Sequence, residues 1–108
     1  MSAQLIFRHM HVDARMPMRV DDEHYNIYAL DWYTIPPFQS AYLRTGVALE
    51  TCPDGVRLAL LPREGPDSAI DPGYMGEIVV RFDNESPEAV QVADREMIGQ
   101  IKINKIVT

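Results

Sequence analysis

Residues 69–77 read Ala69-Ile70-Asp71-Pro72-Gly73-Tyr74-Met75-Gly76-Glu77. The Asp-Pro-Gly triplet is typical of a tight turn, because aspartate bonds to its own backbone, proline fixes φ and glycine permits positive φ. Residues 78–82 then alternate between two faces, with Ile78, Val80 and Phe82 on one of them. This alternation is the period of a half-buried strand. The stretch therefore predicts a tight hairpin that leads into a strand.

The same strand-type alternation recurs outward from this stretch in both directions. Further strands are expected at residues 4–12, 25–30, 56–61, 90–92 and 101–103, because their apolar residues repeat with a period of two. The segments between them are rich in residues that favour turns. Eight prolines scattered over the chain leave no room for a helix longer than about three turns. Many short strands with frequent turns predict an all-β sandwich or closed barrel.

Length and composition indicate one acidic globular domain, residues 1–108. The chain has 108 residues, of which 46% are hydrophobic and 24% are charged, as in ordinary globular domains. The net charge of -6 argues against a nucleic-acid-binding surface, which needs clustered lysine and arginine. Cys52 is the only cysteine, so a reducing compartment such as the cytoplasm is expected. The apolar runs are too short for a membrane span, and the start of the chain does not resemble a secretory signal.

Three other stretches precede residues 69–77: Tyr25-Asn26-Ile27-Tyr28-Ala29, Thr45-Gly46-Val47-Ala48-Leu49-Glu50 and Pro62-Arg63-Glu64-Gly65. With Ala14-Arg15-Met16-Pro17 ahead of them, they resemble in order the motifs of the deoxyuridine triphosphatase (dUTPase) family. The resemblance implies an all-β distorted jelly roll, which is a β-sandwich, and a homotrimer with active sites between subunits. A small domain gains from such an assembly, because alone it buries only a modest fraction of its surface.

The third motif of the family, Ile-Asp-x-x-Tyr-x-Gly, is matched by Ile70, Asp71, Tyr74 and Gly76. In the family this segment holds the uracil through backbone groups, and the tyrosine stacks on the deoxyribose and excludes a 2′-hydroxyl. The resemblance implies that Asp71 orients or activates the attacking water as a general base. The alternative is structural, because Asp-Pro-Gly is what any tight hairpin needs, and Tyr74 would then be core or interface surface.

The second motif departs from the family pattern, Pro-Arg-Ser-Gly, at the serine. The resemblance places Arg63 on the triphosphate, whereas Glu64 replaces the hydroxyl by a carboxylate. Two like charges about 4 Å apart repel by roughly 4 kcal/mol at an effective dielectric constant of about 20, which would weaken binding about a thousandfold. The family also has a further segment between its second and third motifs that is missing here, and with it backbone that helps to cradle phosphate.

The first and fourth motifs are altered as well. The aspartate near the family's Mg²⁺ corresponds to Asn26, and an amide oxygen is a poorer partner for a hard cation than a carboxylate. In the fourth motif Gln100 is kept, whereas Arg95 and Met97 replace a glycine and an arginine. The glycine-rich arm that closes over the triphosphate in the family has no counterpart, because no glycine follows Gly99. Closing segments of this kind exclude water and complete a site.

A pair of histidines and an aromatic segment offer other possibilities. His9 and His11, with Asp13, could bind Zn²⁺ or Ni²⁺. Two histidines without a clear third ligand are more often surface or interface residues, so no metal site is predicted. Residues 32–38, Trp-Tyr-Thr-Ile-Pro-Pro-Phe, are expected to pack in the core, with a trimer interface or a docking surface as the alternative.

The leading hypothesis is a catalytically degenerate, dUTPase-like homotrimer that acts as a structural or interaction protein and needs no cofactor. Its partner would be another protein or a viral shell, for example as a phage decoration protein, so a cytoplasmic or virion location is expected. The alternative is a minimal Mg²⁺-dependent dUTP diphosphatase that forms dUMP and pyrophosphate with Asp71 as base. In that enzyme the substrate would be bound by Tyr74, Ile70, Gly76, Arg63, Gln100 and Asn26. A third possibility is a sensor that binds the deoxyuridine moiety without hydrolysis.

Overall fold

The computed structural model describes residues 4–106, which form strands joined by turns without any helix. The strands are β1 (Ile6–His9), β2 (Met18–Arg19), β3 (His24–Tyr28), β4 (Tyr33–Ile35), β5 (Ser40–Thr51), β6 (Val56–Pro62), β7 (Ser68–Ile70), β8 (Glu77–Asp83), β9 (Val90–Val92) and β10 (Met97–Lys105). The predicted all-β class is therefore confirmed. Within residues 4–106, nothing helical is long and apolar enough to cross a membrane.

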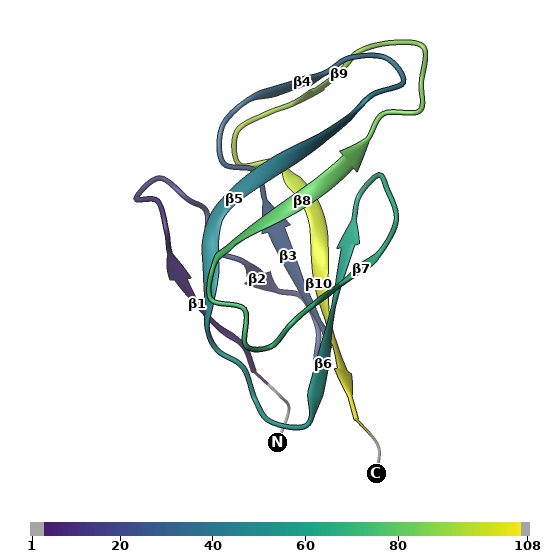
Figure 1. The fold of residues 1–108 in the computed structure, drawn as a ribbon. Coiled ribbons are helices and arrows are strands. Elements are labelled where there is room, and N and C mark those ends of the chain that lie inside the picture. Colours follow the sequence, from purple (N-terminus) through teal and green to yellow (C-terminus); the bar gives the residue numbers. More distant parts are fainter. Residues whose placement is uncertain (1–3, 107–108) are drawn as a thin grey trace.

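Two sheets pack face to face as a sandwich, and a two-stranded ribbon extends from one end of it (Figure 1). The smaller sheet has the order β1-β5-β8, the larger sheet has the order β2-β3-β10-β6-β7, and β4 pairs with β9 in the ribbon. Leu43 and Phe82 from the smaller sheet and Ile27 and Ile101 from the larger one are buried between the sheets. Removal of such side chains from water is the main favourable term in folding. The predicted β-sandwich is confirmed.

Most predicted strands are present, but the longest strand was not anticipated. Of the strand expected at residues 4–12, only the four residues of β1 (Ile6–His9) are in a strand, whereas β5 is 12 residues long. Residues 45–49 of β5 are all buried, so they show no alternation between apolar and polar residues, as in other strands buried on both faces. Gly46 has a φ of 71° beside an irregularity in the pairing with β8, and a Cβ there would lie 2.8 Å from the Cβ of Ala14.

The expected hairpin around Asp71 is wrong in one respect. A tight turn is present, but the strands on either side of it do not pair with each other. β7 pairs with β6 at the edge of the larger sheet, and β8 pairs with β5 at the edge of the smaller one. The segment therefore crosses from one sheet to the other, and the two strands diverge around a space between the sheet edges.

The expectation that residues 32–38 pack in the core is only partly right. Ile35 is fully buried, and Tyr33 packs against the core. Trp32 and Phe38, in contrast, are 69% and 70% exposed. Strand alternation explains Ile35, whereas Trp32 and Phe38 lie in the turns just outside β4, where no second layer covers them. These two large side chains are surface features rather than core residues.

A bidentate ion pair crosses from β5 to β8. The guanidinium of Arg44 donates from Nε to Oε2 of Glu77 at 3.0 Å and from Nη2 to Oε1 at 2.8 Å. The Glu77 side chain is only 16% exposed, although that of Arg44 is 55% exposed. The hydrogen bond from Arg44 holds the pKa of Glu77 below its ordinary value of 4.5.

This ion pair predicts a stability that depends on pH. Because the pKa of Glu77 is lowered in the folded state, the pair stabilises the fold above pH 4.5 and loses that contribution as the pH falls through the lower, folded-state value. Urea unfolding should show Glu77→Gln to be less stable than the parent at neutral pH and equally stable in strong acid. Glu50→Gln, which removes an exposed carboxylate that forms no ion pair within residues 4–106, is the control. A stability gap for Glu77→Gln that stays constant with pH would contradict this account.

Candidate functional site

The turn after β7 is built by Asp71 and closed by Tyr74. Asp71 accepts hydrogen bonds from the N–H of Gly73 at its Oδ1 (2.8 Å) and from the N–H of Tyr74 at its backbone oxygen (2.9 Å). The Tyr74 hydroxyl donates to the backbone oxygen of Glu77 at 3.0 Å. A Cβ at Gly76 would lie 2.6 Å from the Tyr74 hydroxyl oxygen, so only glycine lets the ring lie this close to the backbone.

A cavity of about 330 Å³ opens between β7 and β8, where the two sheet edges diverge. Its lining includes Ile70, Asp71 and Tyr74, with Leu60 and Ile78 as apolar walls. Both strands are edge strands, so each turns a row of unpaired backbone N–H and C=O groups outward. A cavity of this size, with apolar walls and free backbone groups, suits a small flat polar ring. Three predicted site residues therefore gather here, and Gly76 lies behind the tyrosine ring.

Asn26 and Gln100 meet on the larger sheet. They face each other across β3 and β10 in the strand register, and Nε2 of Gln100 donates to Oδ1 of Asn26 at 2.8 Å. Leu61 of β6 lies next in the same row. The Asn26 oxygen, which would replace a carboxylate in binding a cation, thus already accepts a hydrogen bond.

Arg63 is engaged by the segment that leads into β10. Its Nη1 donates to Oε2 of Glu96 at 2.6 Å and to the backbone oxygen of Met97 at 3.1 Å, and its guanidinium lies 5.4 Å from the centre of the Phe82 ring. The hydrogen bond from Arg63 lowers the pKa of Glu96. Sequence reasoning missed Glu96 as a partner of Arg63, although both residues lie in motifs that the resemblance had aligned.

The charges around Arg63 do not favour an anion. Glu64, which follows Arg63, is exposed, and its side chain bonds to no group in residues 4–106. Arg63 contributes +1, and Glu64 and Glu96 contribute -1 each, so these three side chains together carry a charge of -1. Met97, at the position of a family arginine, supplies no charge. Arg95, at the position of a family glycine, keeps a left-handed backbone with a φ of 69°.

The two groups of predicted residues lie apart within one chain. β3 is separated from β7 by β10 and β6, which corresponds to about 14 Å at the usual strand spacing. Residues paired across strands point to the same face, so Asn26, Gln100 and Leu61 share one face of the larger sheet, whereas the next residue along β6, Leu60, lines the cavity from the other face. The chain by itself does not bring the Asn26–Gln100 pair to the Asp71 cavity.

The histidine pair stands apart from both groups. Nδ1 of His11 accepts a hydrogen bond from the N–H of Asp13 at 3.1 Å, and it lies 4.0 Å from Oδ2 of the same residue. His11 also lines a polar cavity of about 230 Å³ with Asp13, Asp31 and Asp94. Over residues 4–106, His, Cys, Asp and Glu side chains do not gather in any group of three that could hold a metal ion.

Known proteins resemble this chain in both sequence and structure, although no family model matches it. The deoxyuridine 5'-triphosphate nucleotidohydrolase of Trichodesmium erythraeum (strain IMS101) is 28% identical, and the match covers 77% of this chain and 66% of that protein. The chain thus spans about two thirds of the length of this curated relative.

Solved structures of phage dUTPases superimpose closely. A dUTPase variant from Staphylococcus bacteriophage 80alpha with dUpNHpp matches with a TM-score of 0.83 and 22% identity, over 97% of this chain and 84% of that one. A dUTPase variant from phage phi11 of S. aureus, in which a structural Mg(II) ion is coordinated, matches with the same TM-score and identity, over 97% and 92%. The sheet topology and this likeness define a β-sandwich of the dUTPase type. In sequence, the chain is similar to the deoxyuridine 5'-triphosphate nucleotidohydrolase described above.

Proposed function

We propose that this chain forms a dUTPase-fold homotrimer that does not hydrolyse dUTP and acts as a structural or interaction module. The net charge of -1 around Arg63 carries the proposal. A triphosphate site needs positive charge and free donors. Here the arginine is already paired with Glu96 at 2.6 Å, and Glu64 adds a free carboxylate beside it.

The Asn26–Gln100 pair supports the same conclusion. A Mg²⁺ ion that serves a triphosphate is usually held by one or two carboxylates together with phosphate oxygens. Asn26 offers an amide oxygen instead, and that oxygen accepts the 2.8 Å hydrogen bond from Gln100. The residues that would hold Mg²⁺ therefore do not fit it.

The trimer is supported by the separation of the predicted site residues. The Asp71 cavity and the Asn26–Gln100 pair lie on opposite faces of the larger sheet. A neighbouring subunit that placed its cavity over this face would bring them together, as the resemblance implies for the family. Leu61, Gln100 and Asn26 are half-buried on this face, and a second subunit would remove their apolar atoms from water.

The partner of such a module would be another protein or a viral shell. The similarity to dUTPases of two staphylococcal phages favours a phage setting, and a threefold oligomer matches the threefold positions of a capsid. We place the protein in the cytoplasm of the host and, as a decoration protein, on the virion. Mass spectrometry of purified particles should find it there in fixed stoichiometry. If purified particles do not contain the protein, the decoration role is wrong and only a role in the cytoplasm of the host is left.

A minimal dUTP diphosphatase is the second candidate, because the Asp71 cavity is intact. Oδ2 of Asp71 makes no hydrogen bond within residues 4–106, so it could bind the attacking water as a general base. Tyr74 would exclude ribonucleotides, and the free edges of β7 and β8 would bind a uracil ring. This candidate requires that Glu64 does not prevent triphosphate binding.

Calorimetric titration with dUMP and dUTP separates the two candidates, because only the enzyme needs affinity for the two outer phosphates. Our proposal expects dUTP with Mg²⁺ to bind no more tightly than dUMP. Any binding of dUMP should be abolished in Tyr74→Ala and kept in Tyr42→Ala, which removes another exposed tyrosine, outside the cavity. Binding of dUTP that is tenfold or more tighter than that of dUMP would overturn the proposal.

A further inference from the structure

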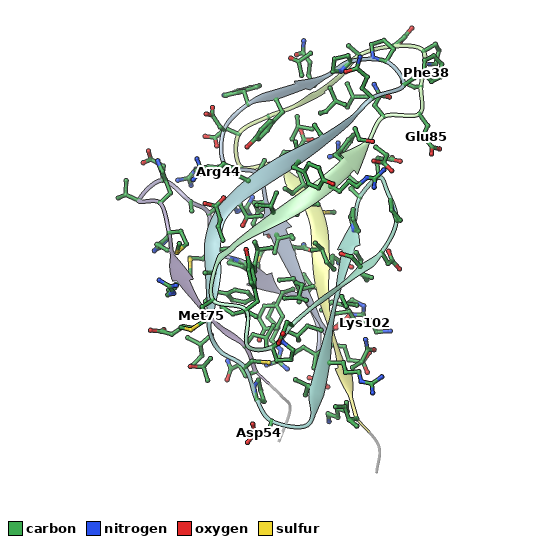
Figure 2. All side chains as sticks on the ribbon, in the orientation of Figure 1. Phe38, Arg44, Asp54, Met75, Glu85 and Lys102 are labelled. Carbon is green, nitrogen blue, oxygen red and sulfur yellow. The ribbon has the colours of Figure 1, made fainter. Side chains whose placement is uncertain are left out.

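A hollow of about 260 Å³ lies at the end of the sandwich where the turn before β5 meets the turn after β8. We call it the Phe38 hollow; its walls are Phe38, Ser40, Arg81, Asp83 and Glu85. Figure 2 shows Phe38 and Glu85 at this end of the molecule, far along β8 from Met75 in the Asp71 turn. The Phe38 hollow is therefore separate from the cavity between β7 and β8.

Hydrogen bonds of the Asn84 side chain hold the walls of the hollow in place, and Asn84 itself is only 4% exposed. Its Nδ2 donates to the backbone oxygens of Ile35 and Pro36 at 3.1 Å and of Glu88 at 2.8 Å. Its Oδ1 accepts from the N–H and the hydroxyl of Ser86 at 3.0 and 2.7 Å. The two turns are thus held in one arrangement before any partner arrives, which lowers the entropy cost of binding.

The Phe38 side chain lies on the surface of the protein rather than in its core. Its side chain is 70% exposed, and its backbone has a φ of 57°, a left-handed conformation that is unfavourable for a bulky residue. Strained backbone of this kind persists where the surroundings hold it in place, and here the N–H of Phe38 donates to the oxygen of Ser86 at 3.3 Å. An exposed aromatic ring on a rigid turn is typical of a binding anchor.

The charges in the hollow favour a cation. Nε of Arg81 is paired with Oδ1 of Asp83 at 2.8 Å, and the same oxygen accepts the Ser40 hydroxyl at 2.6 Å. The Glu85 side chain forms no hydrogen bond or ion pair within residues 4–106. One arginine and two carboxylates leave a net charge of -1 in the hollow. A neighbouring cavity, which shares Asp83 and Glu85, adds Arg63 and Glu64, whose charges cancel in the sum.

The geometry points to an arginine or lysine side chain of a protein partner as the occupant of the Phe38 hollow. The cation would lie over the Phe38 ring and pair with Glu85. An acidic segment would be repelled by the same carboxylate. A second copy of this chain carries 10 lysine and arginine side chains against 16 aspartates and glutamates, so a more basic partner matches the charge of the hollow better. The inference rests on the proposed role as an interaction module, and it names the chemistry of the partner.

NMR titration of the 108-residue protein with a blocked tetra-arginine peptide tests this inference, with a blocked tetraglutamine peptide as the uncharged control. Amide shifts are expected to change at residues 38–40 and 81–86 with the arginine peptide alone. Phe38→Ala and Glu85→Gln should each weaken binding about twofold to fivefold, since each removes one exposed cation contact. The matched controls are Trp32→Ala, an equally exposed aromatic outside the hollow, and Glu23→Gln.

Several results would overturn the inference. They are shift changes spread over the acidic surface, equal weakening in the control variants, or no binding at millimolar peptide. If Phe38→Ala converts a trimer into monomers in sedimentation, another copy of the chain covers the hollow and the inference is wrong. Turnover of dUTP would instead overturn the proposed function, and it would leave the peptide result to be judged separately.

Discussion

The double variant Glu64→Ser/Met97→Arg should bind dUTP at least about thirtyfold more tightly than the parent, with little change for dUMP. The exchange removes one negative charge and adds one positive charge near Arg63. Each change at about 4 Å from a phosphate is worth about 1 kcal/mol at the dielectric constant of water and about 4 kcal/mol at an effective value of 20. Glu64 is exposed, so we take the lower figure, and two such changes correspond to a factor of about thirty.

The control for this variant must change the net charge equally at a distance from Arg63. Glu50→Ser/Val12→Arg does so at two exposed positions. Isothermal titration with dUTP and dUMP in the presence of Mg²⁺ is the measurement. A gain that appears in the control as well would be a long-range effect of net charge. No gain in the Glu64→Ser/Met97→Arg variant would mean that charge near Arg63 is not what prevents triphosphate binding.

Asn84→Ala should destabilise the protein by about 3 kcal/mol, because it removes a buried side chain that makes five hydrogen bonds, including a buried one to the Ile35 oxygen. The Nδ2 of Asn84 donates to the backbone oxygens of Ile35, Pro36 and Glu88, and its Oδ1 accepts a hydrogen bond from Ser86. Urea unfolding at neutral pH measures the loss. The expected loss is large because the side chain is buried and bonds both to the segment around Ile35 and Pro36 and to the turn after β8.

Asn84→Asp sharpens the test, because aspartate keeps the shape of asparagine but has no N–H donors. Its ionised carboxylate would face carbonyl oxygens, so the pKa of the new side chain should be raised. A group whose folded-state pKa is raised destabilises the fold while it is ionised, so this variant should gain stability as the pH falls. Ser86→Ala removes one hydroxyl of the same network and should cost less. An Asn84→Ala variant as stable as the parent would contradict the assigned role.

The strands and turns that depend on a short-range pattern of residues could be predicted from the sequence. Alternation in residues 25–30 and 56–61 located β3 and β6, and the Asp-Pro-Gly triplet located the turn before Tyr74. β5 was missed because residues 45–49 are buried on both faces, and burial of this kind erases the period on which the prediction depends.

Features that depend on long-range packing could not be predicted from pattern. The Asp71 turn looked like a hairpin, and only the sheet order shows that β7 and β8 belong to different sheets with a cavity between them. Likewise, Glu96 lies 33 positions from Arg63, and no local signal marks such a pair. The predicted roles of Asp71, Tyr74, Ile70, Gly76 and Gln100 remain predictions, although the structure does gather Ile70, Asp71 and Tyr74.

The most direct test of the central claim is pyrophosphate release from dUTP with Mg²⁺, with dTTP and UTP as controls and Asp71→Asn as the blank. If the charge of -1 summed over Arg63, Glu64 and Glu96 prevents triphosphate binding, the protein should release no more pyrophosphate than the blank, even at high protein concentration. Release that is specific for dUTP and absent in Asp71→Asn would show that Glu64 is tolerated. That result would make the chain a working dUTP diphosphatase and would contradict the account given above.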